Sequence, residues 1–201
     1  MIRETSYNDV FDAQRHFRTI IDSMSRPGKI NRFAPLALTP PPGMHRASAY
    51  VAFALLNADV SFVTSHAGHA ADYIRANTHS RSAAPGQADF LFLRGDEPDD
   101  AALIDVAKVG LPAYPEGGAT AVLQVDHIGK SSATGGLQLM LEGPGIETRE
   151  IVFVRGLRSE LLATLQAKNA EFPLGVDAIL VSADECVICL PRTSKAAWTT
   201  L

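Results

Sequence analysis

The chain has 201 residues, of which 46% are hydrophobic and 20% charged, and its formal net charge is -4. This length and composition can bury a large core, so we expect one α/β domain spanning residues 1–201. The acidic balance disfavours nucleic acid and anionic membranes as partners, because such binding depends on clustered Lys and Arg. Neither a signal-peptide core nor an apolar run of spanning length occurs, which predicts a cytoplasmic location.

The first predicted element is an amphipathic helix over residues 8–24. Its apolar positions have helical spacing, and the charged positions between them are free to face water. The apolar positions are Phe11, Phe17, Ile20, Ile21 and Met24. Asn8 or Asp9 can cap the helix, and Pro27 and Gly28 should end it. Arg26, at this end, most simply caps carbonyl groups, with a phosphate contact as the alternative.

Helices and strands are predicted to alternate through the middle of the chain, as in an α/β fold. A proline-rich extended connection precedes them, since proline fixes the backbone in an extended form. The predicted elements are an extended segment at 33–43, a buried helix at 47–56, a strand at 60–63, a helix at 70–77, a strand at 88–93 and a helix at 101–106.

Three histidines and an acidic run in this region could suggest a metal or catalytic site. His66 and His69 are three residues apart, but no carboxylate or cysteine completes a metal set at a recognisable spacing. We therefore interpret them, with His79, as solvated loop residues and predict no metal. Residues 96–100 carry four carboxylates directly before a predicted helix, where acids favour the helix N-terminus. This position favours capping over catalysis.

Two later segments alternate between apolar and polar residues and predict strands. They are residues 118–126 and residues 137–142, joined by a loop at 129–136 that is rich in Gly and Ser. This arrangement predicts an antiparallel hairpin. Such pairing would bring two sharp bends, Pro115–Gly118 and Gly143–Gly145, to one edge of the sheet.

The remaining predicted elements are a strand at 149–154, a helix at 158–170 and strands at 178–181 and 186–190. Cys186 and Cys189 are spaced as Cys-x-x-Cys, but they lie in an apolar run that is typical of a strand. Side chains three apart in a strand point to opposite faces, which is unsuitable for a shared zinc ion or a disulfide. Both thiols are therefore predicted to fill the core.

Three separated blocks of this sequence form one ordered pattern. The first block contains Asp-Ala-Gln at 12–14, Phe-Arg at 17–18 and Met-Ser-x-Pro-Gly at 24–28. The second runs Pro-Glu-x-Gly-Ala-Thr at 115–120 and leaves its strand through Gly-x-Gly-Ile at 143–146. The third opens with Phe-Pro-Leu-Gly-Val-Asp at 172–177 and closes with Pro-Arg-Thr at 191–193. Together, in this order, the blocks resemble the PhnH family, which belongs to the bacterial carbon-phosphorus lyase system of phosphonate metabolism, although the loop at 129–136 looks longer than in the family.

The resemblance implies a mixed sheet between helices, similar to the large domain of pyridoxal-phosphate-dependent transferases but without the cofactor lysine. Pyridoxal phosphate needs a lysine for its Schiff base. On this sequence all five lysines fall in turns, helix ends or the tail, and no cofactor is expected. The glycines form neither a P-loop nor a dinucleotide motif, and no Gly-x-Ser-x-Gly nucleophile motif occurs.

The function implied is a member of an assembly that acts with subunits G, I and L to transfer the ribose triphosphate of ATP to a phosphonate, displacing adenine. Subunits G, I and J are the expected partners, and a homodimer is expected in isolation. The alternative is a free-standing enzyme acting on a phosphorylated small molecule.

Within the matching blocks, the candidate contacts to a ligand or partner are Arg26, Glu116, Gly117, Gly118, Gly143, Gly145 and Arg192. The glycines and Glu116 could form one rim, although glycines there only to make bends are the simpler interpretation. Arg26 and Arg192 lie beside prolines, and their replacement by Ala is expected to weaken assembly more than folding.

Overall fold

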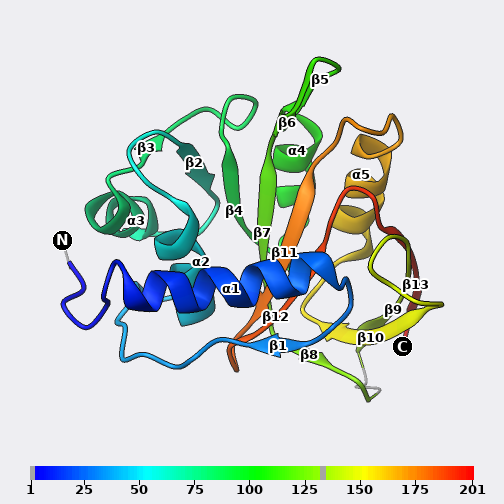
Figure 1. Ribbon diagram of the computed structural model, residues 1–201, viewed down its shortest axis with the longest axis horizontal. Helices are drawn as coiled ribbons and strands as arrows, with labels where there is room; N and C mark the ends of the chain where they lie inside the picture. The colour runs from blue at the N-terminus through cyan, green and yellow to red at the C-terminus, as the bar shows by residue number, and fades with distance from the viewer. Residues whose placement is uncertain (1–2, 132–134) are drawn as a thin grey trace.

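In the computed structural model the chain forms three layers, with a seven-stranded mixed sheet in the middle (Figure 1). The structure describes residues 3–131 and 135–201. One side of the sheet is covered by the first three helices and the other by the last two helices and a second sheet. The helices are α1 (Phe11–Ser25), α2 (Arg46–Leu55), α3 (Ala70–Thr78), α4 (Asp100–Asp105) and α5 (Ser159–Lys168).

The central sheet has the strand order β1-β12-β11-β7-β4-β2-β3. Its strands are β1 (Asn31–Arg32), β2 (Ser61–Thr64), β3 (Arg81–Ser82), β4 (Phe90–Arg94), β7 (Thr120–Val125), β11 (Asp177–Ser182) and β12 (Cys186–Leu190). Strands β3, β2, β4, β7 and β11 run parallel, while β12 is antiparallel to both β11 and β1. The predicted mixed α/β class is therefore confirmed.

The parallel strands are buried on both faces, which explains their nearly unbroken apolar sequences. In β4, Phe92 joins the core under α1, α2 and α3, while Leu91 and Leu93 join the core under α4 and α5. Cys186 and Cys189 divide between these two cores in the same way and are both buried and free. The prediction of two core-filling thiols on opposite faces is confirmed.

The second sheet is antiparallel and has the order β13-β9-β10-β8. It buries one face against the central sheet through the leucines of β9. A separate two-stranded sheet extends from the top of the molecule in Figure 1. The strands of these sheets are β5 (Val109–Leu111), β6 (Tyr114–Gly118), β8 (His127–Gly129), β9 (Gly136–Glu142), β10 (Glu150–Arg155) and β13 (Lys195–Thr200).

The predicted hairpin of 118–126 against 137–142 is wrong in its pairing, although both segments are strands. β7 pairs with β4 and β11 in the central sheet, whereas β9 pairs with β10 and β13. The reason is burial. Because β7 is covered on both faces and paired on both edges, it offers no edge to β9, while β9 buries one face only. Part of the predicted loop, residues 132–134, lies outside the described residues.

The predicted buried stripe of α1 is also largely wrong. Only Ile20 of the five predicted positions is fully buried, while Phe11, Phe17 and Ile21 are exposed. His16 lies on the inner face instead, since its Nε2 lies 3.0 Å from the carbonyl oxygen of Ala34. The predicted cap is confirmed, because the side-chain oxygen of Asn8 accepts hydrogen bonds from two backbone N–H groups at the helix start.

The other predicted helices and strands occur in the expected order, with ends that differ by a few residues. The sequence did not predict β13, which was expected as a tail, or the short strands β1, β3, β5, β6 and β8. Among the described helices, none combines the length and the apolar character needed to cross a lipid bilayer.

Candidate functional site

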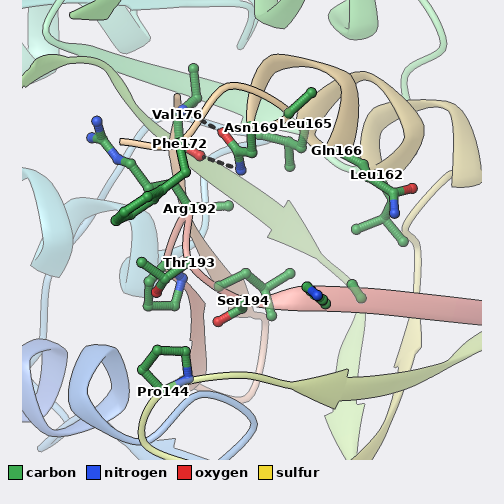
Figure 2. A pocket seen from close by; sticks show the side chains of 16 residues that line it. Pro144, Leu162, Leu165, Gln166, Asn169, Phe172, Val176, Arg192, Thr193 and Ser194 are labelled. Atoms are coloured by element: carbon green, nitrogen blue, oxygen red, sulfur yellow. Dashed lines mark hydrogen bonds between the residues drawn. The ribbon is translucent and has the colours of Figure 1, made fainter. Parts of the chain in front are cut away.

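A cleft of about 640 Å³ opens between α5 and the segment that joins β12 to β13 (Figure 2). Its walls are mainly apolar, with α5 on one side and Pro144, from the turn after β9, at the far end. The lining residues used below are Leu162, Leu165, Asn169, Phe172, Arg192 and Ser194.

The cleft exists because the chain changes sheets at Pro191. β12 ends at Leu190, and Pro191 has no N–H with which to continue the ladder. The chain then crosses to β13, which pairs with β9 in the second sheet. Since α5 remains packed on the central sheet, a wedge-shaped space is left between α5 and the crossing segment.

Arg192 lies at one end of this cleft and is held by intramolecular bonds. Its Nη2 donates to Oδ2 of Asp177 at 2.6 Å, its Nε lies 3.2 Å from both carboxylate oxygens, and Nη1 donates to the carbonyl oxygen of Pro115 at 2.8 Å. Its side chain is only 12% exposed. The guanidinium therefore connects the start of β11 to β6.

Asn169, at the end of α5, binds the backbone with both ends of its amide. Its Oδ1 accepts from the N–H of Val176 at 2.7 Å and its Nδ2 donates to the Val176 carbonyl at 3.1 Å, the two dashed lines in Figure 2. The loop before β11 is thereby closed onto α5. Like Arg192, Asn169 has its polar groups directed at the protein.

Ser194 is different, because its Oγ is buried and has no hydrogen-bond partner among the described residues. A buried hydroxyl without a partner loses the free energy that a hydrogen bond would return. The cleft therefore has a mainly apolar wall that includes the exposed ring of Phe172, and its lining also contains the unbonded Ser194 hydroxyl and the side chains of Gln166, Thr193 and Lys195. This chemistry suits binding of an apolar group that carries a hydrogen-bonding atom.

The structure brings some predicted site residues to this cleft and separates others. Gly118 lies against Arg192, since an added Cβ would be 2.8 Å from Nη1. Gly143 lies at the other end, where an added Cβ would be 3.0 Å from the carbonyl oxygen of Thr193. Glu116 and Gly117 are exposed on β6. The two bends belong to different sheets, so they do not meet at one sheet edge as the predicted hairpin required, and ligand or partner contacts by these residues stay a prediction.

Arg26 and Gly145 lie together near the end of α1. A Cβ on Gly145 would overlap the carbonyl oxygen of Ser25, and Arg26 forms an ion pair with Asp22, one helical turn earlier. The expected carbonyl capping by Arg26 is replaced by this ion pair. Its side chain is half exposed, so a partner contact stays a prediction for Arg26.

Sequence reasoning missed a second polar group, at the carboxyl ends of the parallel strands. The strand register, continued past the last paired residues, aligns His66, Arg94 and Gln124 on one face of the sheet. Gln124 Oε1 also accepts from the backbone N–H of His45 at 2.7 Å, at the start of α2. These residues are brought together only by the pairing register of the strands, and a single sequence does not show that register.

The interpretation of His66 as a solvated loop residue is wrong, although His69 and His79 are exposed as predicted. His66 is 6% exposed, and both ring nitrogens lack a partner among the described residues. Burial, followed by the nearby Arg94 charge, lowers the pKa of His66 to about 4. His66 is therefore neutral at physiological pH.

This burial predicts loss of stability in mild acid. The unfolded chain takes up a proton at His66 near pH 6.5, whereas the folded protein does so only near pH 4. Stability should therefore fall between these values, by about 2 kcal/mol on going from about pH 7.5 to about pH 5. Urea unfolding across this range should show a flatter profile for His66→Gln than for the control His69→Gln. Equal slopes for the two variants would contradict the assignment.

The predicted helix-capping role of the acidic run is not what the structure shows for Asp100. Its Oδ2 accepts from Ser65 Oγ at 2.5 Å and from the backbone N–H of Arg94 at 2.7 Å. Burial raises the pKa of the Asp100 carboxyl. Asp100 thus ties α4 to the ends of two strands. Over residues 3–131 and 135–201, no three His, Cys, Asp or Glu side chains are grouped as metal ligands would be.

These features define a three-layer mixed α/β protein with a mainly apolar cleft, at one end of which Arg192 is engaged internally. The chain belongs to the PhnH family of bacterial phosphonate metabolism proteins, whose family model matches residues 5–197. This match confirms the resemblance drawn from the three sequence blocks.

Two curated relatives are similar over nearly the whole chain. The alpha-D-ribose 1-methylphosphonate 5-triphosphate synthase subunit PhnH of Rhizobium meliloti (strain 1021) is 33% identical over 199 residues, covering 92% of this chain and 90% of the relative. HtxG of Stutzerimonas stutzeri, whose name describes a C-P lyase subunit protein, is 32% identical over 182 residues, covering 90% and 84%.

Proposed function

We propose that this chain is a subunit of a carbon-phosphorus lyase assembly and acts with subunits G, I and L in transferring the ribose triphosphate of ATP to a phosphonate. The observation that carries the proposal is the family match over residues 5–197, together with a relative whose name makes it a subunit of the ribose methylphosphonate triphosphate synthase. Other subunits of the assembly, G, I and J, are the proposed partners, and the cytoplasm is the proposed location.

The geometry supports a subunit role through the chemistry of the cleft. Arg192 and Asn169 direct their polar groups inward, and the buried Ser194 hydroxyl has no partner among the described residues. A cleft of this kind can receive an apolar group of a partner or ligand, whereas acid–base catalysis needs a positioned proton donor or acceptor. Exposed apolar side chains elsewhere offer additional contact surface.

A fold like the large domain of the pyridoxal-phosphate transferases, without use of the cofactor, is part of this proposal. The layered mixed sheet is compatible with it. Four of the five lysines hold intramolecular partners: Lys29 binds Asp22, Lys108 binds Asp89, Lys130 binds Glu150 and Lys168 binds the Asp105 carbonyl. Lys195 is exposed on β13.

The proposal predicts assembly and phosphonate use. The chain, co-expressed with subunits G, I and J from its own genome, should co-purify with them. It should also restore growth on methylphosphonate as the sole phosphorus source in a strain that lacks only this subunit. Light scattering should report a homodimer for the isolated protein, with an interface on the order of 1,000 Å² or more. A folded chain that neither co-purifies nor restores growth would contradict the subunit assignment.

The alternative, a free-standing enzyme acting on a phosphorylated small molecule, makes the opposite prediction. It should turn over such a substrate without the other subunits, and variants at the cleft should abolish that turnover. Ser194→Ala is the appropriate variant, because it removes the buried hydroxyl that has no partner among the described residues and leaves the apolar wall. Turnover by the isolated chain that depends on Ser194 would favour the enzyme.

A further inference from the structure

The outer face of α1 carries the densest group of exposed apolar side chains in the described residues. Ten large hydrophobic side chains are exposed among the described residues, and four of them lie on α1 or directly before it: Val10, Phe11, Phe17 and Ile21. Val10, Phe17 and Ile21 are separated by seven and four residues, which places them on one side of the helix. α1 lies across the front of the molecule in Figure 1 with no element in front of it.

Nothing in the core requires these side chains to be apolar, because α1 already packs on the core through other side chains. Ile20 and His16 make that inner contact, and Phe33 and Tyr50 pack around the His16 ring. Exposed apolar groups of this size, gathered on one helix face, are typical of surfaces that another protein covers.

Beside the apolar stripe lies a groove with excess positive charge. The groove, of about 510 Å³, runs between α1 and β1, and Arg15, Arg18 and Arg32 line it. Its one carboxylate, Asp22, is already bonded to Lys29 and Asn31 and paired with Arg26.

Arg32 is bonded to the side chain and the backbone carbonyl of Asp184, whereas the two groove arginines on α1 are weakly engaged. Arg15 has a single ion pair, at 3.8 Å, and Arg18 has no ionic or hydrogen-bond partner among the described residues. Exposed arginines beside apolar groups supply both packing area and charge-assisted hydrogen bonds to carboxylates.

We infer that this face, the α1 docking face, binds another subunit of the assembly through apolar side chains that cover Val10, Phe17 and Ile21 and carboxylates that enter the arginine groove. The inference rests on the proposed function, which supplies the other subunits. Charge decides between this occupant and a second copy of the chain. In a symmetric pair the same arginines would face one another, which is unfavourable, whereas an acidic surface complements them.

Two substitutions separate the apolar and charged parts of the face. Ile21→Glu places a charge in the apolar stripe, and Arg18→Glu reverses a groove charge that no intramolecular bond of the described residues uses. The matched controls are Leu111→Glu, an equally apolar exposed residue on β5, and Arg81→Glu, an exposed arginine on β3. Because all four side chains are exposed, circular dichroism and the thermal midpoint should stay close to those of the unsubstituted protein.

The probe is the set of subunits G, I and J co-expressed from the same genome, and the measurement is affinity by biolayer interferometry at low and high salt. Ile21→Glu should weaken binding about tenfold or more. Arg18→Glu should weaken it about three- to tenfold, mainly by slowing association, and the loss should shrink at high salt. The two controls should bind as the unsubstituted chain does.

Three outcomes would contradict the inference. If the unsubstituted chain binds no subunit, the proposed function itself fails. If it binds and both α1 variants bind equally well, the docking face is elsewhere and the proposed function stands. If Ile21→Glu instead converts a homodimer to a monomer while subunit binding is unchanged, the occupant is a second copy. Should Ile21→Glu fail to fold, Arg18→Glu decides the question alone.

Discussion

Replacing Arg192 with alanine is expected to lower the free energy of unfolding by about 2–3 kcal/mol, because it leaves a partly buried carboxylate without its charged partner and with only the backbone N–H of residue 192. The guanidinium bonds Asp177 and the Pro115 carbonyl, and its removal frees both. This differs from the expectation from sequence, in which the replacement weakens assembly more than folding. The measurement is urea unfolding at neutral pH, where the midpoint should fall and the slope should stay the same.

The control for Arg192 is Arg158→Ala, which breaks an exposed pair with Glu160 and should change stability by less than about 0.5 kcal/mol. The double variant with Asp177→Asn should recover part of the loss, since no unpaired charge remains. If Arg192→Ala is as stable as Arg158→Ala, the intramolecular bonds contribute little and Arg192 is free to serve a ligand or partner.

Replacing Gly145 with alanine is expected to cost about 3 kcal/mol, for two combined reasons. Its φ of 84° lies in the left-handed region that a side chain disfavours, and the new Cβ would overlap the Ser25 carbonyl oxygen. The turn after β9 would have to move away from the end of α1. Thermal and urea unfolding should both report the loss.

Gly43→Ala is the matched control, because Gly43 has a similar φ of 87° but an added Cβ would meet nothing within 4 Å. It should cost about 1 kcal/mol, from backbone strain alone. The difference between the two variants measures the close approach of the turn to α1. Equal costs would show that the turn moves freely and that the glycine serves only its bend.

The sequence was sufficient to predict the elements whose burial follows from the local pattern of apolar residues. β4 and β12 are continuous apolar runs, and α2 is small and apolar on nearly all sides, so each was predicted near its observed bounds. The strand pairing could not be predicted in this way, because the partners of β7 lie far away in sequence, at β4 and β11. Pairing across such separations depends on the whole sheet and leaves no local signal.

The candidate site was also predicted only in part from the sequence. Arg192 was predicted as a candidate contact because it follows Pro191. Its bonds to Asp177 and to the Pro115 carbonyl could not be predicted, because they form only when three segments meet in the fold. His66 was missed because its burial results from the neighbouring strands and the start of α2. On α1, helical spacing correctly predicted that apolar side chains gather along the helix, but spacing alone does not say whether the core or a partner covers them.

The pairing of β1 with β12 has a consequence for how the protein is made. The first strand of the chain finds its partner more than 150 residues later, at Val187 and Cys186, and α1 also packs against β12. On the ribosome, the N-terminal helix therefore emerges long before the strand it must cover, and contacts of such long range form slowly. The part of α1 that covers β12 stays open until synthesis is nearly complete, although α2 is available to pack against α1 much earlier, so a chaperone or an early-arriving subunit can meet this part of the helix first.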